Sequence, residues 1–349
     1  MTATIAEFLD KMGVVARYFD CGRRIQEIPS KTMQQFEDGD IAYPHPYLHH
    51  AWLGLLFWDP QAPDMPLLWF LKFPLDEQAK LVPAARNEFL KQLLVTVGHN
   101  LQAIQDGEKM QGILDGNPYT FTPTPERQAS MHATAKQVMQ LQPSDHYPIA
   151  CDYLSSDLSQ WQGVAVQGLA DVAQHWQQHQ SELINAMPNL PQEPLLALCQ
   201  CLENHKLSGA LSKAITERIS REREQQAPQG SVIAALVRAI SASQAKELRQ
   251  RCLQSLLLDE QTTDIEVLAA IATRCHQDLQ DPLLCMPFLE RLAQHPQATF
   301  NRVLADVLFL PELRNHILAC FRAGERSQTL IAAIGGLLNP GGSTQSNQH

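Results

Sequence analysis

Histidine side chains that could ligate a metal ion lie in the segment YPHPYLHHAWLGLLFW, residues 43–58. His45 and His49 are four residues apart, the spacing that places two side chains on one face of a helix. The two prolines of PHP oppose a helix here, because a residue that precedes proline is pushed toward an extended conformation. In an extended chain His45 and His49 share one side while His50 points to the other, and a metal site would need a further ligand from elsewhere. The segment therefore favours a turn that leads into a buried strand over a metal site.

A second histidine pair, His175 and His179, lies in the sequence HWQQH and is followed by Glu182. On one continuous helix these three side chains would lie near one face, as they do in zinc sites carried by a helix. The zinc hydrolase pattern also needs a glutamate directly after the first histidine to act as general base, and Trp176 occupies that position. The hydrolytic reaction is therefore excluded. Two interpretations remain: a non-catalytic metal site, and a polar, glutamine-rich helix face. The second is favoured.

Eight cysteines are scattered along the chain without a CxxC pair. Cys199 and Cys201, together with His205, have the composition of a ligand set. Positions two apart on a helix differ by about 200° of rotation, so these two thiols would point to opposite sides and are better interpreted as buried structural cysteines. Scattered cysteines in a long chain indicate reduced thiols in a cytoplasmic protein.

Nucleotide-binding and nucleophile signatures are absent from the sequence. It contains no GxxxxGK[ST], no GxGxxG between a predicted strand and helix, and no GxSxG. We therefore expect no cofactor, no catalytic residues and no metal ligands, and we consider an enzyme the less favoured class of protein.

Basic residues predominate between positions 205 and 251, where nine lysines and arginines outnumber four glutamates although the whole chain has a net charge of −10. Charges four apart, such as Glu217 and Arg221, are typical of an exposed helix with internal salt bridges. The alternative is a basic ridge that docks an acidic protein. Its candidate partner-binding residues are Lys213, Arg218, Arg221, Arg238 and Arg249.

The length and composition of the chain predict the number of domains and the class of protein that carry these residues. A chain of 349 residues exceeds the size of most single cores, which predicts two domains. The acidic balance, with a pI of about 5.7, argues against a protein whose whole surface binds nucleic acid, because phosphate neutralisation needs excess Lys and Arg. The longest apolar run, residues 51–58, is far shorter than the ~20 residues of a membrane helix. We expect a cytoplasmic protein without membrane contact.

The first part of the chain, residues 1–115, predicts a small α+β domain. Two apolar runs, residues 51–58 and 67–73, flank a turn-rich segment and predict an antiparallel hairpin. Both faces of these strands are apolar, which is typical of strands buried on both sides. A long helix is predicted from Pro83 toward Gly107. The Pro- and Thr-rich segment 116–126 is the predicted connector to the next domain.

Helical periodicity continues from residue 127 to 338, and the tail 339–349 is predicted to be disordered. Successive helix pairs are predicted to start 39, 32 and 35 residues apart, close to the period of known helix-pair repeats. The pairs are 192–204 with 207–222, 231–242 with 245–258, 263–277 with 281–294, and 298–309 with 311–322. Stacking of such pairs would bury their apolar stripes and leave long surfaces exposed. The alternative is an irregular helical domain.

Two resemblances follow from this layout. The aromatic hairpin around AWLGLLFWD and PLLWFLKF, followed by a helical part, resembles an uncharacterised bacterial protein family of unknown function. That resemblance implies no activity and no functional residues. The C-terminal half resembles the α-helical repeats of HEAT and armadillo solenoids, which implies a partner-binding surface. The expected fold class is thus mainly α, with a small antiparallel sheet and its helices followed by a HEAT-like solenoid.

Three functions are consistent with these features. The favoured hypothesis is a non-catalytic interaction or adaptor protein that binds an unknown protein partner through the helical repeats. The first alternative is an enzyme with an interdomain site near His45, His49 and the aromatic hairpin. The second is nucleic-acid binding through residues 213–251. The sequence identifies neither the partner, nor the pathway, nor a small-molecule ligand.

Overall fold

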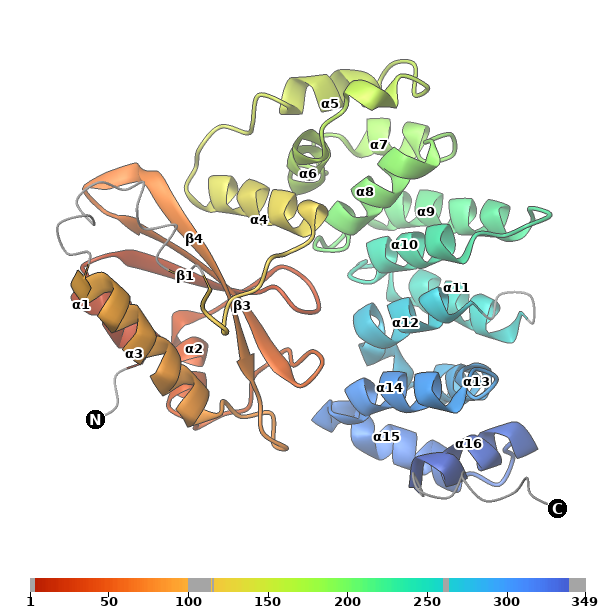
Figure 1. The fold of residues 1–349 in the computed structure, drawn as a ribbon. Coiled ribbons are helices and arrows are strands. Elements are labelled where there is room, and N and C mark those ends of the chain that lie inside the picture. The colour runs from red at the N-terminus through yellow and green to blue at the C-terminus, as the bar shows by residue number, and fades with distance from the viewer. Residues whose placement is uncertain (1–3, 100–113, 115, 260–263, 339–349) are drawn as a thin grey trace. The chain divides into compact units, whose positions relative to one another are not determined.

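The computed structural model describes residues 4–99, 114, 116–259 and 264–338 (Figure 1). By its internal contacts the chain divides into two units, Met1–Pro143 and Ser144–His349. The first unit contains a sheet and helices, and the regular elements described in the second are all helices, so the predicted α+β domain followed by a helical domain is confirmed. None of the helices in the described ranges is long and apolar enough to cross a membrane. The predicted disordered tail lies outside these ranges.

The first unit is built around a four-stranded antiparallel sheet with the strand order β2-β1-β3-β4. Its strands are β1 (Val15–Asp20), β2 (Gln26–Ile28), β3 (His50–Asp59) and β4 (Ala62–Pro74). Strands β3 and β4 form the predicted hairpin, in which Leu55 lies opposite Trp69. Strand β3 is central, and Leu53, Leu55 and Phe57 on it are fully buried.

Helices cover both faces of this sheet, as the two-sided apolar strands predict. The helices are α1 (Ile5–Lys11), α2 (Ser30–Glu37), α3 (Pro83–His99) and α4 (Pro125–Val138). On one face α3 brings Phe89 edge-on to Phe73 of β4, with ring centroids 5.5 Å apart. On the other face Met131 of α4 packs in a core with Phe19 and Leu56. The predicted extension of α3 toward Gly107 lies outside the described residues.

Helix α4 belongs to the first unit, although the sequence predicts a helical domain that starts at residue 127. The unit boundary lies after Pro143, because Met131 and Ala135 of α4 pack on the sheet. Thr124 caps this helix by accepting a hydrogen bond from the backbone N–H of Arg127. The segment 116–126 therefore connects β4 and α3 to another helix of the same unit.

The second unit is a stack of helices in which each helix contacts the helix two further along the chain, so that alternate helices form two layers (Figure 1). For example, α10 packs against α8 and α12, and α11 packs against α9 and α13. The helices are α5 (Tyr147–Leu154), α6 (Val166–Gln174), α7 (Gln180–Ala186), α8 (Gln192–Leu202), α9 (Gly209–Arg223), α10 (Gly230–Ile240), α11 (Lys246–Leu258), α12 (Ile265–Arg274), α13 (Pro282–Leu292), α14 (Gln297–Leu308), α15 (Pro311–Arg322) and α16 (Gln328–Leu338).

The predicted helix pairs correspond to α8/α9, α10/α11, α12/α13 and α14/α15. Proline stands at the N-cap of α8 and α14 and at the first position of α13 and α15, where a missing backbone N–H is tolerated. The apolar stripes of α10 and α12 are buried, as their periodicity predicts. The assignment of this stack to the HEAT class stays a prediction.

Candidate functional site

The five predicted partner-binding residues lie on three consecutive helices of the second unit: α9, α10 and α11. Arg218 of α9 points inward. Its guanidinium donates hydrogen bonds to the backbone carbonyls of Met187 at 2.9 Å and Pro188 at 2.7 Å, directly after α7, and to the carboxylate of Glu222 at 2.6 Å. Because the Arg218 and Glu222 side chains are only 13% and 7% exposed, this residue ties two helices together.

Arg249 of α11 has a similar role one helix pair later. It forms a bidentate ion pair with Asp278, with N–O distances of 2.8 and 3.0 Å, and also donates to the backbone carbonyl of Ser243 at 2.7 Å. The two paired side chains are 11% and 3% exposed. Arg223 at the end of α9 pairs in the same way with Asp259, after α11, at 2.7 Å. The guanidinium groups of Arg249 and Arg223 are therefore engaged in contacts within the helical unit.

Lys213 and Arg221, by contrast, are exposed on the outer side of α9. The Lys213 ammonium lies 3.8 Å from the carboxylate of Glu217, and both side chains are more than half exposed. Arg221 is exposed and forms no hydrogen bond or ion pair with any described residue. Arg238 of α10 is half-buried in the stack. The structure thus separates the predicted set into two outward residues and three that lie within the packing.

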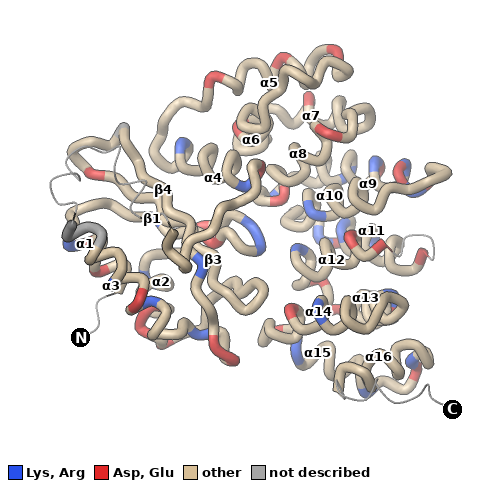
Figure 2. The backbone as a smooth tube through the Cα atoms, in the orientation of Figure 1, with Lys and Arg blue, Asp and Glu red and all other residues tan. Residues whose placement is uncertain are grey.

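This separation reduces the surface charge of the predicted ridge. Within residues 206–251, all of which are described, the exposed basic side chains are Lys206, Lys213, Arg221, Lys246 and Arg251, and the exposed acidic ones are Glu217, Glu224 and Glu247. Figure 2 shows both signs of charge along α9 and α11. The outer face of these helices is therefore a mixed-charge surface with a small positive surplus.

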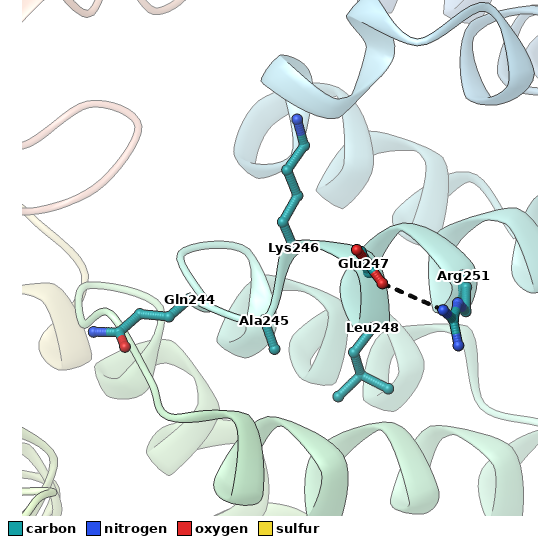
Figure 3. A pocket seen from close by; sticks show the side chains of 6 residues that line it. All are labelled: Gln244, Ala245, Lys246, Glu247, Leu248 and Arg251. Carbon is teal, nitrogen blue, oxygen red and sulfur yellow. Dashed lines mark hydrogen bonds and ion pairs between the residues drawn. The ribbon is translucent and has the colours of Figure 1, made fainter.

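A hollow of about 500 Å³ opens at the start of α11. It is lined by the consecutive residues 244–248 and by Arg251 (Figure 3). Arg251 lies 3.3 Å from the carboxylate of Glu247, one helical turn earlier. The backbone N–H of Gln244 donates to the carbonyl of Leu207 at 3.1 Å, so the hollow is anchored to the turn that precedes α9.

His49 lies in a tight turn that leads into β3, as the prolines predict, while His45 precedes this turn and His50 is the first residue of β3. Leu48 and His49 both have left-handed backbone conformations, with φ of 50° and 59°. Hydrogen bonds between the backbones of Tyr47 and His50, at 3.0 and 3.1 Å, close the turn. In the part of the chain that the structure describes, no three His, Cys, Asp or Glu side chains are arranged to hold a metal ion.

HWQQH forms a turn between two helices, so its two histidines do not share the face of one continuous helix. Helix α6 ends at Gln174 with His175 as its C-cap, and α7 begins at Gln180 with His179 as its N-cap. The reason is the cluster of hydrogen bonds that closes the turn, including one from the N–H of Gln178 to the carbonyl of His175 at 2.9 Å.

This turn is part of a polar cluster that the sequence did not predict. The Tyr147 hydroxyl lies 2.6 Å from Nε2 of His179, and Cys151 Sγ lies 3.7 Å from the same nitrogen. The Tyr147 ring packs against the His175 ring, with centroids 5.5 Å apart, and Nδ1 of His175 contacts the backbone carbonyl of Asp171 at 2.8 Å. The only sequence signal was the spacing of four between Tyr147 and Cys151, which places both on one face of α5.

Cys199 and Cys201 are both fully buried in α8, in agreement with the structural interpretation. His205, beyond the end of that helix, contributes no metal site with them among the described residues. Burial lowers the pKa of His205 to about 4, so its imidazole is neutral at physiological pH.

Comparison with known proteins yields a family and no activity. Residues 1–338 match the family described as "Protein of unknown function (DUF3549)", which shows that the chain belongs to it. The predicted resemblance to an uncharacterised family is thereby confirmed. No curated protein and no solved structure matches the chain.

Proposed function

We propose that this member of the DUF3549 family is a non-catalytic interaction or adaptor protein that binds a protein partner through its helical unit. The proposal is carried by one observation: buried arginines lock neighbouring helices together, while the side chains on the outer side of α9 and α11 stay exposed. A surface held rigid before binding loses less conformational entropy when a partner docks. The locking residues Arg218 and Arg249 thus support binding indirectly, and Lys213 and Arg221 would contact the partner.

The same arginine contact recurs further along the stack. Arg291 of α13 donates to the backbone carbonyls of Leu257 at 2.8 Å and Leu258 at 3.1 Å, at the end of α11. Arg218 of α9 makes the equivalent contact with the residues that follow α7. An interaction repeated between helices two apart is the behaviour expected of a repeat array, and it supports the finer proposal that the unit is a HEAT-like solenoid.

An acidic protein segment is the partner that this surface fits best. Arg221 of α9 and Lys246 of α11 are exposed cations without a carboxylate partner in the described residues, and their helices pack against each other. Lys246 also lines the hollow at the start of α11. Carboxylates that met these groups would add complementary charge without breaking an existing ion pair. Lys213 and Arg251, whose present carboxylate partners are exposed, can exchange them at little cost.

Charge reversal tests this proposal without disturbing the fold. The double variant Lys213→Glu with Arg221→Glu should lose a reproducible partner that the unmodified protein captures at physiological salt, measured by affinity purification with quantitative mass spectrometry. The matched control is Arg302→Glu, an exposed arginine on α14, which should retain the partner. Loss of the partner in both variants, or in neither, would refute docking on α9 and α11.

Nucleic acid is distinguished from a protein partner by the same purification. Nuclease treatment should leave the captured set of proteins unchanged, because binding that depends on nucleic acid is lost when the nucleic acid is digested and weakens steeply with salt.

We also propose a cytoplasmic location, supported by the eight cysteines, all of which are described and free. Fractionation of cells that contain the native protein tests this location.

A further inference from the structure

Cys151 differs from the other cysteines of the chain in combining access to solvent with a nearby base. All eight cysteines are described, and only Cys151 and Cys252 are half-exposed while the other six are buried. Cys151 Sγ lies 3.7 Å from Nε2 of His179, within reach for a hydrogen bond from sulfur. Burial raises the pKa of Cys252 to about 12, and no described imidazole contacts it.

We propose that Cys151 is a modification site that reacts with low-molecular-weight disulfides, with His179 accepting the thiol proton. In this exchange Sγ of Cys151 attacks one sulfur of the disulfide and a new S–S bond forms as the original one breaks. The proton moves from Sγ to Nε2 of His179 and then to the departing thiolate, which leaves as a thiol. One disulfide and one thiol are consumed, and one mixed disulfide and one thiol are produced.

Tyr147 competes with Cys151 for the same lone pair. A neutral imidazole offers one acceptor nitrogen, and the Tyr147 hydroxyl lies closer to Nε2 of His179, at 2.6 Å, than the thiol does. When the phenol donates to this nitrogen, the imidazole cannot take the thiol proton. Tyr147 is thus a positioning residue that restrains the reactivity of Cys151.

The surroundings keep the thiol and the imidazole neutral. Burial raises the pKa of Cys151 and lowers the pKa of His179, so the resting pair at pH 7 is a thiol and a free base. The ionisable groups around Cys151 and His179 come from α5, α6, α7 and the turn between α6 and α7, and they are Tyr147, Asp152, Asp171, His175, His179 and Glu182. General-base assistance of this kind typically accelerates a reaction by about 10²- to 10⁴-fold.

The test is the rate at which each cysteine of the folded, full-length protein forms a mixed disulfide with oxidised glutathione, followed by peptide mass spectrometry at pH 7.5. Cys151 should react at least about tenfold faster than Cys252 in the same molecule. His179→Gln, which keeps a hydrogen-bond acceptor but no base, should slow Cys151 by about tenfold or more. Tyr147→Phe should accelerate it severalfold, because the competing donor is removed.

Cys252→Ser is the control variant and should leave the Cys151 rate unchanged, whereas Cys151→Ser should abolish the fast adduct. Thermal unfolding of each variant verifies that the fold is retained. Equal rates for Cys151 and Cys252, or an unchanged rate in His179→Gln, would overturn the assignment of the site. A Tyr147→Phe variant no faster than the unmodified protein would overturn the competition between phenol and thiol.

Discussion

Two ways of holding a buried carboxylate can be compared in this protein, one from each unit. In the sheet unit backbone N–H groups hold the buried carboxylates: Asp20 accepts from residues 22, 23 and 24 at 3.2 to 3.4 Å, and Glu37 accepts from the first two residues of α1 at 2.7 and 3.0 Å. Arg23 and Arg86 are also buried there, and they donate to backbone carbonyls. In the helical unit arginines such as Arg249 and Arg218 bind carboxylates and carbonyls about 30 residues away.

The difference shows what each kind of unit lacks. A tight turn leaves backbone N–H groups without partners, and a nearby carboxylate satisfies several of them at once. Stacked helices already satisfy their inner backbone groups, but their last carbonyls stay open, and a long guanidinium can reach them from the helix two further along the chain. In the sheet unit Asp20 therefore shapes a local turn and Glu37 satisfies the start of α1, whereas in the helical unit arginines such as Arg218 join helices two apart along the chain.

The largest effect should follow from breaking the arginine contacts. Arg249→Ala leaves the carboxylate of Asp278, 3% exposed, buried without its cation, which typically destabilises a protein by about 3 to 5 kcal/mol. Chemical denaturation should show this loss in the free energy of unfolding of the helical unit. The double variant Arg249→Ala with Asp278→Ala should regain part of it, because no unpaired charge remains buried.

Arg251→Ala is the matched control on the same helix. Its ion pair with Glu247 is exposed on both sides, at 79% and 86%, and removal should change stability by less than about 0.5 kcal/mol. Equal effects of the two substitutions would contradict the distinction between inward and outward arginines.

A smaller loss in the free energy of unfolding is expected when the sheet unit loses the buried carboxylate of Asp20. Asp20→Asn keeps the size of the side chain but turns an NH₂ group toward backbone donors and toward the Tyr43 hydroxyl, which lies 2.8 Å from the carboxylate. Leaving such donors unsatisfied typically costs about 1 to 3 kcal/mol each, partly relieved by local movement. We expect about 2 kcal/mol in denaturation of the sheet unit.

Asp76→Asn provides the comparison for this substitution. Asp76 accepts from the backbone N–H groups of Gln78 and Lys80, both at 2.8 Å, in a similar turn that is open to solvent. Water can satisfy the released donors there, so the change should be well below that of Asp20→Asn. A larger effect at Asp76 would show that burial is not the deciding factor.

Local patterns in the sequence predict the hairpin, the buried strands and the helix pairs because each depends on neighbouring residues. The membership of α4 in the sheet unit was not predictable in this way, since it depends on Met131 meeting Leu56 across 75 positions. The charge count of residues 205–251 was correct, but the inward direction of Arg218 and Arg249 depends on partners 29 to 31 residues away. The cluster at Cys151 was missed for the same reason, because His179 lies 28 residues further on.

Backbone strain also distinguishes the units, and removing it should stabilise the protein slightly. Among the described residues, the non-glycine residues with left-handed φ are Leu48, His49, Ala79 and Gln140, all in the sheet unit. A two-residue turn of this geometry favours Asn-Gly. Leu48→Asn with His49→Gly should therefore raise the free energy of unfolding by about 1 kcal/mol, since each strained residue costs about 1 to 2 kcal/mol and glycine also loosens the unfolded chain.

Gln140→Gly relieves the strain of one residue outside the turn at Leu48 and His49, and it should raise the free energy of unfolding by about half as much as the Asn-Gly variant. Thermal or chemical denaturation of both variants measures these gains. Destabilisation by the Asn-Gly variant would show that the Leu48 and His49 side chains contribute contacts that outweigh their backbone strain.

The smallest effect should come from the outer side of α9. Lys213→Ala removes an ion pair of 3.8 Å whose members are 70% and 58% exposed, so stability should change by no more than about 0.5 kcal/mol. The free energies of unfolding of Lys213→Ala and Arg249→Ala, both measured by denaturation, compare the loss of an exposed ion pair with the loss of a buried one in the same helical unit. If Lys213 contributes little to the fold, a partner can take its ammonium from Glu217 without weakening the stack. A loss above about 1 kcal/mol would instead place Lys213 among the residues that hold the helices together, and it would remove the basis for assigning it to a binding surface.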